Sequence, residues 1–282
     1  MNRQNKKEKK HPLIIVTGAN GYIGKQLLPN LHKYYRVGVD VKPTTAEEPY
    51  TILQADLSKP DNVKDLFKKY TPDIIYHFAA LISPEVNEKN VALAKESHLT
   101  VTQNILDYLP DETHLFFLST DKVFDGSHPR PNEEAPTHPL WKYGEFKLQC
   151  EKMIQEQVKR YHILRLPIIH SLGNRDSSSF IDMALLQIKE NKPVQIYDNV
   201  FRCYVLVSDV VSVLTALIDD THYGVYHLGT EMSSYYDRVK YLCDRYHIKY
   251  ESLLKPSQGS VTPMKQNLDT RKIRSLLSFN FE

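Results

Sequence analysis

The sequence predicts an α/β fold, a parallel sheet covered by helices on both faces, from three observations. Short runs rich in apolar and β-branched residues alternate with longer stretches of helical periodicity through residue 170. The first run leads directly into a glycine-rich turn. The 282 residues are 41% apolar and 25% charged, as in globular proteins with a full core. Apolar strands separated by helices form parallel sheets with both faces buried.

Six strands and four helices alternate in this part of the chain. The strands are expected at residues 13–17, 36–40, 51–55, 73–78, 114–119 and 161–166. The helices are expected at residues 22–32, 61–70, 87–108 and 141–160. Most strand runs are dominated by Val, Ile, Leu and Phe, whereas the helices repeat apolar residues every three or four positions. This order predicts successive βαβ units.

After Pro167 the pattern loosens. Strands are expected at residues 194–197, 204–207 and 225–228, and helices at residues 180–190, 208–218 and 235–247. We therefore expect a disordered basic tail over residues 1–10, a sheet domain over 11–170 and a smaller α+β lobe over 171–282. Some of the later chain is expected to cross back to the first domain. The two lobes would form a ligand cleft at the carboxyl ends of the parallel strands.

Charge and hydropathy exclude several classes of function. Lys and Arg number 36 and Asp and Glu 34, a net charge of +2, which does not favour nucleic acid or an anionic membrane as partner. No run approaches the roughly 18 apolar residues that span a bilayer. The basic start is followed by only a short apolar run at residues 13–16, too short for a signal peptide.

Three isolated cysteines, Cys150, Cys203 and Cys243, form no paired motif for zinc or for dithiol chemistry. No acidic cluster indicates another metal site. The odd number and wide spacing of the cysteines suit a reducing compartment. We therefore expect a cytoplasmic protein without a metal.

The glycine motif TGANGYIG, residues 17–24, follows the first strand and opens the first helix. Gly18 permits a tight turn, Gly21 lets the backbone approach a pyrophosphate, and Gly24 lets helix and strand pack closely. Free N–H groups at the start of the helix can then bind phosphate. The motif predicts a dinucleotide site in a Rossmann-type domain.

Asp40 closes the second strand, 16 residues after the last glycine of the motif. A carboxylate there can accept hydrogen bonds from the adenosine ribose hydroxyls, and it would repel a 2′-phosphate. Lys42 would offset part of that repulsion. NAD(H) is therefore favoured, and NADP(H) remains the alternative.

Tyr143 and Lys147 lie one helical turn apart, which places a phenol and an ammonium group on one helix face. A free tyrosine titrates near pH 10, and a neighbouring cation is expected to bring its pKa toward neutrality. The phenol could then exchange a proton with a carbonyl or alcohol oxygen. Ser119 and Thr120 end the fifth strand, and we expect their hydroxyls to point into the cleft, where one would bind the same oxygen. The alternative interpretation is an exposed helical pair and a turn.

Together these motifs resemble the extended short-chain dehydrogenase/reductase family. The resemblance rests on TGANGYIG, on HFAA at residues 77–80, on the strand-end STD and on YGEFK. Within that family the chain is most similar to dTDP-4-dehydrorhamnose reductases. That similarity is carried by LSTDKVFDG (118–126), NEEAPTHPLWKYGEFK (132–147), ILRLPIIHS (163–171) and NLDTRKI (267–273). It covers nearly the whole chain and implies a doubly wound Rossmann-type sheet with a smaller substrate lobe.

The resemblance also implies roles for individual residues. The catalytic set would be Thr120, Tyr143 and Lys147. The cofactor would contact Gly18, Asn20, Gly21, Tyr22, Ile23, Gly24, Asp40, Asp56, Leu57, Ala79, Ala80, Tyr143, Lys147 and Pro167. The substrate would contact Asp121, Lys122 and Arg202, with the planar guanidinium on a nucleotide diphosphate.

The implied activity is NAD(P)H-dependent reduction of a nucleotide-linked 4-keto-6-deoxysugar, with hydride passing to C4 and Tyr143 as the proton donor. Homodimers are common in the family. Two alternatives stay open: an NAD-dependent sugar-nucleotide epimerase, and a non-catalytic regulatory protein on the same fold. A 4,6-dehydratase is disfavoured because Lys122 stands where such enzymes carry a second carboxylate.

Three features depart from the pattern of the reductases. They usually carry tyrosine at the position of Lys122, and they commonly carry asparagine near the position of His98. They also often accept NADPH, whereas Asp40 favours NADH.

Overall fold

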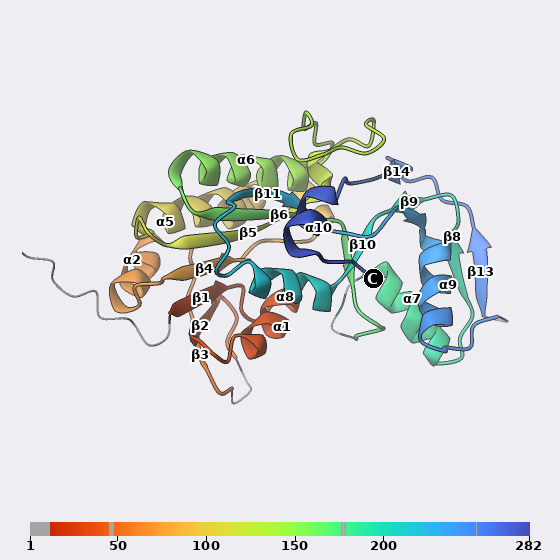
Figure 1. The fold of residues 1–282 in the computed structure, drawn as a ribbon, viewed down its shortest axis with the longest axis horizontal. Helices are drawn as coiled ribbons and strands as arrows, with labels where there is room; N and C mark the ends of the chain where they lie inside the picture. Colours follow the sequence, from red (N-terminus) through yellow and green to blue (C-terminus); the bar gives the residue numbers. More distant parts are fainter. Residues whose placement is uncertain (1–11, 45–47, 176, 178, 252) are drawn as a thin grey trace, which may run out of the picture.

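Seven parallel strands form the central sheet, in the order β11-β6-β5-β4-β1-β2-β3 (Figure 1). The computed structural model describes residues 12–44, 48–175, 177, 179–251 and 253–282, so the basic tail at 1–10 lies outside the described residues. The strands are β1 (Leu13–Thr17), β2 (Tyr35–Asp40), β3 (Thr51–Gln54), β4 (Ile74–His77), β5 (His114–Thr120), β6 (Tyr161–Leu166) and β11 (Gly224–His227). The predicted α/β fold class, a Rossmann-type doubly wound sheet, is confirmed.

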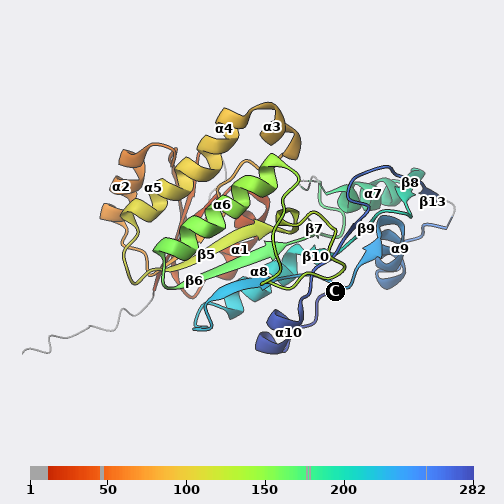
Figure 2. The same cartoon turned by 90° about the horizontal axis from the view of Figure 1, so that it is seen from above.

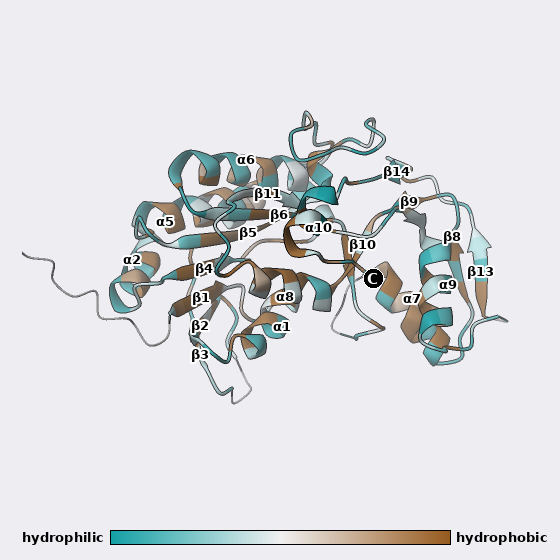
Figure 3. Ribbon diagram, viewed as in Figure 1, coloured by the Kyte–Doolittle hydropathy of each residue, from teal (hydrophilic) through white to brown (hydrophobic). Residues whose placement is uncertain are grey.

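Helices cover both faces of this sheet. The helices α2 (Pro60–Lys69), α5 (Val101–Tyr108) and α6 (Lys142–Gln157) form one layer, and α1 (Tyr22–Asn30) and α8 (Val207–Ala216) form the other (Figures 1 and 2). Side chains alternate between the faces, so Ile14 and Val16 pack with α1 and α8 while Ile15 packs with α2 and α5. The hydrophobic colour of strands such as β1 and β4 in Figure 3 reflects this burial on both sides.

The strand order reverses between β1 and β4. The chain moves from β1 outward to β2 and β3, then returns to β4 on the other side of β1. In open α/β sheets, ligands bind at the carboxyl edge of the sheet where the strand order reverses, here at the loops that follow β1 and β4. The glycine motif follows β1 and lies at this point.

The helix predicted over 87–108 is wrong as a single element. The structure divides this region into α3 (Pro84–Lys89), α4 (Val91–Lys95), the π-helical turn η1 (Glu96–Thr100) and α5. Asn90 leaves the helical conformation, at φ −130°, and its side chain accepts a hydrogen bond from Leu93 N as the cap of α4. The apolar periodicity runs through both interruptions, so it did not reveal them.

The later chain builds a small lobe and also returns to the large sheet. In the lobe, α7 (Phe180–Lys189) and α9 (Tyr235–Arg245) pack with the parallel pair β8 (Val194–Tyr197) and β13 (Leu254–Ser257). By contrast, β11 pairs with β6, α8 packs on α1, and α10 (Arg271–Leu277) contacts β11. The lobe boundary near residue 170 stays a prediction.

The strand expected at residues 204–207 is β10 (Tyr204–Leu206). Several other elements are too short for any periodicity to predict. They are β7 (Ile168–His170), β9 (Phe201–Arg202), β12 (Ser233–Ser234), β14 (Lys265–Gln266) and the 3₁₀ turn η2 (Asp121–Val123). The strands of this group pair with partners far away in the sequence, such as β7 with β10 and β14 with β9.

A buried histidine pair lies at the amino edge of the sheet, opposite the glycine motif. His114 Nε2 and His162 Nδ1 are 2.7 Å apart, and His162 Nε2 lies 3.4 Å from the Asp220 carboxylate. Burial lowers the pKa of His114 to about 3 and the pKa of His162 to about 4. Arg160 and His222, which lie nearby, also lower these pKa values, whereas Asp220 raises them.

We expect this pair to make the fold sensitive to acid. In the unfolded chain both histidines take up a proton near pH 6.5, so the unfolded state binds more protons below that pH and stability falls as the pH drops toward 4. The loss should approach about 1.4 kcal/mol per group and pH unit. Urea unfolding at pH 7.5 and pH 5 measures it. The double variant His114→Leu/His162→Leu should show a shallower pH dependence, whereas His32→Asn, at an exposed site, should match the wild type. An unchanged slope in the double variant would contradict the assignment.

Candidate active site

The glycine loop brings the ends of β1 and β4 into close contact. Gly18 has φ +70°, and a Cβ at this position would lie 2.9 Å from Ala79 N. A Cβ on Gly24 would lie 2.4 Å from Gly18 O, and Gly21 N donates to that same carbonyl at 2.9 Å. Side chains at Gly18 and Gly24 are therefore excluded. The Ala79 backbone lies against the loop.

Asp40 is held beside this loop by two backbone amides. Its Oδ2 accepts from Asn20 N and its Oδ1 from Lys42 N, both at 2.9 Å. The Asn20 side chain in turn donates to Lys42 O. Each carboxylate oxygen keeps a further lone pair, so Asp40 can still accept from a ligand hydroxyl. The structure therefore brings Asn20 and Asp40 together.

The other predicted cofactor residues lie at or near the same edge of the sheet. Tyr22 and Ile23 begin α1, Asp56 and Leu57 follow β3, Ala80 follows β4, and Pro167 separates β6 from β7. Leu57 is buried, and its carbonyl accepts from Asn104 Nδ2 at 2.9 Å. The Tyr22 hydroxyl is buried and has no hydrogen-bond partner among the described residues.

The predicted catalytic residues come from β5 and α6. Thr120 ends β5, and its Oγ1 lies 3.3 Å from Asp121 Oδ1 and accepts from Lys122 N. Lys147 is 3% exposed, donates from Nζ to Leu118 O at 2.8 Å and lies over the Phe117 ring. The helix α6 packs along β5, which brings Lys147 against Leu118 and Phe117.

Within the protein alone, Lys147 does not lower the pKa of Tyr143, and the lowering expected from Lys147 together with the nicotinamide ring stays a prediction. Burial raises the pKa of the Tyr143 phenol, and the negative charge of Asp121 raises it further. Lys147 is turned to the Leu118 carbonyl, and its own burial lowers the pKa of its ammonium group to about 8. The phenol is therefore protonated at neutral pH, which is the form that a proton donor needs.

Ser119 does not point into the cleft, contrary to expectation. Its Oγ donates to the Glu151 carboxylate, which also pairs with Arg165 NH2 at 2.7 Å. The strand alternation that directs Thr120 to one side of β5 directs Ser119 to the other. Thr120 is therefore the candidate hydroxyl of this pair.

The three predicted substrate residues have different surroundings. Asp121 is buried, which raises its pKa against the opposing charges of Lys122 and Arg202. The Lys122 ammonium group makes no hydrogen bond or ion pair with the residues that the structure describes. Arg202 donates to the carbonyls of Phe201 and Pro263, among others, within its own lobe. Contact of Arg202 with a diphosphate stays a prediction.

Sequence reasoning missed the ion pair between Glu151 and Arg165, which are 1% and 4% exposed. Arg165 also donates to the Glu133 carbonyl and contacts His227 at 3.3 Å. One signal was present in the sequence: Tyr143, Lys147 and Glu151 recur at four-residue spacing on α6, and so lie on one face.

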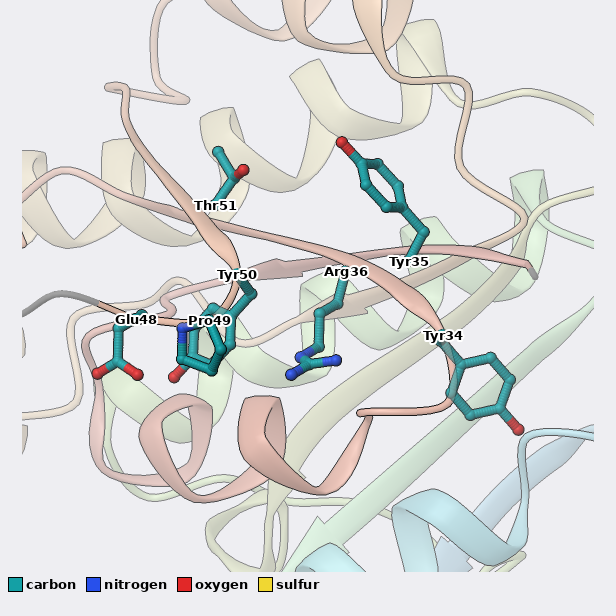
Figure 4. Close-up of a pocket in the computed structure, with 7 residues that line it drawn as sticks. All are labelled: Tyr34, Tyr35, Arg36, Glu48, Pro49, Tyr50 and Thr51. Atoms are coloured by element: carbon teal, nitrogen blue, oxygen red, sulfur yellow. The ribbon is translucent and has the colours of Figure 1, made fainter.

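A shallow pocket of about 370 Å³ lies away from all these residues (Figure 4). Tyr35 and Thr51, the first residues of β2 and β3, contribute to its lining, so it opens at the amino edge of the sheet. Arg36 points toward Tyr50, with its guanidinium carbon 5.1 Å from the ring centroid. None of the predicted catalytic, cofactor-binding or substrate-binding residues lines this pocket.

No helix in the described ranges is long and apolar enough to cross a membrane. No group of three or more His, Cys, Asp or Glu side chains in the same ranges could hold a metal ion.

Known proteins resemble the chain over nearly its whole length. The dTDP-4-dehydrorhamnose reductase of Bacillus anthracis, solved with NADP, has a TM-score of 0.83 at 22% identity and covers 96% of this chain and 95% of its own. The UDP-glucose 4-epimerase of Thermus thermophilus, solved with NAD, has a TM-score of 0.79 at 20% identity and covers 95% of each chain. These likenesses show the shared fold.

Among curated proteins, methionine adenosyltransferase 2 subunit beta of Bos taurus is 24% identical in an alignment 277 residues long that covers 93% of this chain and 82% of the relative. The model of the RmlD substrate binding domain matches residues 12–279. Together with the solved reductases, that match confirms the resemblance inferred from the motifs. Because the match spans almost the entire chain, this protein belongs to the RmlD substrate binding domain family.

Proposed function

We propose that this protein is an NAD(P)H-dependent reductase of a nucleotide-linked 4-keto-6-deoxysugar, acting as dTDP-4-dehydrorhamnose reductases do. One observation carries the proposal: Thr120 and Lys147, which are buried, and Tyr143, which is partly buried, lie at the same edge of the sheet as the glycine loop. Family membership and the fold shared with reductases support it.

The residues present fit a nicotinamide dinucleotide. The loop at Gly18 and Gly24 has no room for side chains, and the free amides at the start of α1 suit a pyrophosphate. Asp40 keeps free lone pairs beside this loop for the ribose hydroxyls. When bound, the reduced cofactor supplies a hydride for the sugar carbonyl carbon.

The chain's own residues supply the proton. Tyr143 holds it on the phenol oxygen and donates it to the C4 oxygen, so the carbonyl becomes a secondary alcohol. The Thr120 hydroxyl orients that oxygen, and the Lys147 charge stabilises the phenolate that remains. Asp121, Lys122 and Arg202 face the sugar nucleotide in this proposal, and related structures hold UDP-glucose or UDP-glucuronic acid. We further propose that the protein acts in the cytoplasm as a homodimer.

Asp40 should set the choice of cofactor. Wild-type protein is expected to bind NADH more tightly than NADPH, and Asp40→Ser should lower NADH affinity and raise NADPH affinity. Removing the carboxylate removes both the acceptor for the ribose hydroxyls and the repulsion of a 2′-phosphate. Fluorescence titration with both nucleotides measures the ratio. Asp65→Ser, at an exposed position on α2, should keep the wild-type ratio. Equal ratios for the Asp40 and Asp65 variants would contradict this role.

The oxidation of NADH and NADPH tests the activity. Each nucleotide is offered with dTDP- or UDP-4-keto-6-deoxyglucose, with and without a 3,5-epimerase. The proposal predicts net oxidation with at least one keto-sugar. Protein that is purified with tightly bound NAD⁺ and turns over no added NADH would instead indicate an epimerase.

A second candidate is a non-catalytic regulatory subunit, because the curated relatives are named as subunit beta of methionine adenosyltransferase 2. The presence of Thr120, Tyr143 and Lys147 weighs against it, since a regulatory role requires none of their chemistry. Stable binding to a methionine adenosyltransferase catalytic subunit, with no oxidation across the sugar panel, would establish it.

A further inference from the structure

A buried chain of hydrogen bonds begins at Thr17, the last residue of β1. Its Oγ1 lies 3.1 Å from both Phe78 N and Ala79 N, and 3.0 Å from His77 Nδ1. A hydroxyl oxygen has two lone pairs and one hydrogen. The Phe78 amide also donates to Thr17 O at 3.3 Å; in the arrangement in which both amides donate to Oγ1, the hydroxyl hydrogen points to His77 Nδ1.

The orientation of every later bond follows from this first one. His77 accepts at Nδ1, so the neutral ring carries its hydrogen on Nε2 and donates it to Thr102 Oγ1 at 3.0 Å. Thr102 then donates to Cys150 Sγ at 3.3 Å, and the Cys150 thiol donates to His98 O at 3.5 Å. Burial lowers the pKa of His77 to about 3, so the ring stays neutral at physiological pH. In this arrangement, the donors and acceptors of these hydrogen bonds all run in the same direction, from Thr17 to the His98 carbonyl.

The two ends of the chain lie at the two halves of the proposed site. At the first end, the Ala79 amide lies against Gly18 in the glycine loop. At the other end, Cys150 belongs to α6, and the His98 ring meets Tyr143 edge-on with the centroids 5.7 Å apart. His98 is further fixed because its Nε2 lies 3.1 Å from Leu81 O and 3.1 Å from Asn87 Oδ1.

The five residues that form this series of hydrogen bonds have almost fully enclosed side chains. They are between 0% and 2% exposed: Thr17, His77, His98, Thr102 and Cys150. No water can replace a lost partner at such depth without first opening the core, so one missing hydroxyl leaves a donor or an acceptor unsatisfied.

We propose that Thr102 is a positioning residue that fixes the catalytic helix α6 relative to the end of β4 and the glycine loop, where the cofactor is proposed to bind. Its hydroxyl links His77 on β4 to Cys150 on α6. It touches neither substrate nor cofactor. The proposal rests on the proposed reductase function only for its kinetic consequence.

Valine is close to threonine in shape but lacks the hydroxyl, so Thr102→Val leaves the His77 N–H without an acceptor. We expect kcat to fall about 10- to 100-fold, as for a small misplacement of reacting groups, with the KM for NADH unchanged. Thr102→Ser keeps the hydroxyl and should restore most of kcat. Thr215→Val is the matched control, because the Thr215 hydroxyl bonds only carbonyls of its own helix α8.

Trp141, the single tryptophan, gives a readout that does not depend on activity, because it caps the start of α6. Energy transfer from Trp141 to bound NADH reports the placement of the helix relative to the cofactor. At saturating NADH, Thr102→Val should change the transfer efficiency, while Thr102→Ser and Thr215→Val should match the wild type.

Wild-type transfer and kcat in Thr102→Val would overturn the proposal, as would equal losses in the valine and serine variants. Failure to bind NADH would overturn it too, since the cleft would then not hold the cofactor. Protein that binds NADH but reduces no keto-sugar would refute the reductase function alone and leave the energy-transfer comparison decisive.

Discussion

Replacing Tyr143 with phenylalanine is expected to lower kcat for keto-sugar reduction by about 10²- to 10⁴-fold, the usual worth of a positioned proton donor. The phenol lies at the start of α6, where burial and the charge of Asp121 keep it protonated through a raised pKa. The variant keeps the ring and its edge contact with His98. The loss should therefore appear mainly in kcat.

Steady-state kinetics of Tyr143→Phe and of the control variant Tyr108→Phe show whether the loss of activity is specific to the Tyr143 hydroxyl. Tyr108 ends α5 with 36% of its surface exposed, so its variant should retain wild-type rates. A Tyr143→Phe protein that oxidises NADH at the wild-type rate with the keto-sugar would refute the assigned proton donor.

Glu151→Ala is expected to destabilise the protein by about 3–5 kcal/mol, the usual cost of removing one partner from a buried ion pair. Glu151 accepts from Ser119 Oγ on β5 and from Arg165 Nε and NH2 on β6, at 3.1 Å and 2.7 Å for the arginine. Without it the Arg165 guanidinium, 4% exposed, loses its counter-charge. Urea unfolding followed by circular dichroism measures the change.

Two comparisons make this prediction specific. Glu156→Ala, on the exposed face of the same helix, should change the free energy of unfolding by less than about 0.5 kcal/mol. The double variant Glu151→Leu/Arg165→Met removes both charges and should recover part of the lost stability. If the two alanine variants cost equally little, the pair does not anchor α6.

The alternation of apolar runs and helical periods was enough to predict the doubly wound sheet, because each βαβ unit is encoded locally. The pairing of strands that lie far apart in the sequence could not be predicted in this way. β11 was predicted as a strand near residues 225–228, but its place beside β6 depends on contacts between segments about 60 residues apart. The break at Asn90 and the π-turn at Glu96–Thr100 were hidden because the apolar spacing continues through them.

The candidate site was predictable where spacing alone carries the chemistry. The glycine loop, and the pair of Tyr143 and Lys147, follow from motifs within a few residues. The direction of Ser119 and the raised pKa of Tyr143 depend on burial and on partners from other elements. The same holds for the link from His77 through Thr102 to Cys150, which joins three distant segments.

The transfer of a labelled hydride tests the central claim most directly. NADH deuterated at C4 of the nicotinamide is incubated with the keto-sugar nucleotide, and the product is examined by proton and deuterium NMR. The proposed function predicts one deuterium at sugar C4 for each NADH oxidised, with the new hydroxyl on the same carbon. A sugar that is unchanged, or epimerised without deuterium while NADH persists, would contradict it.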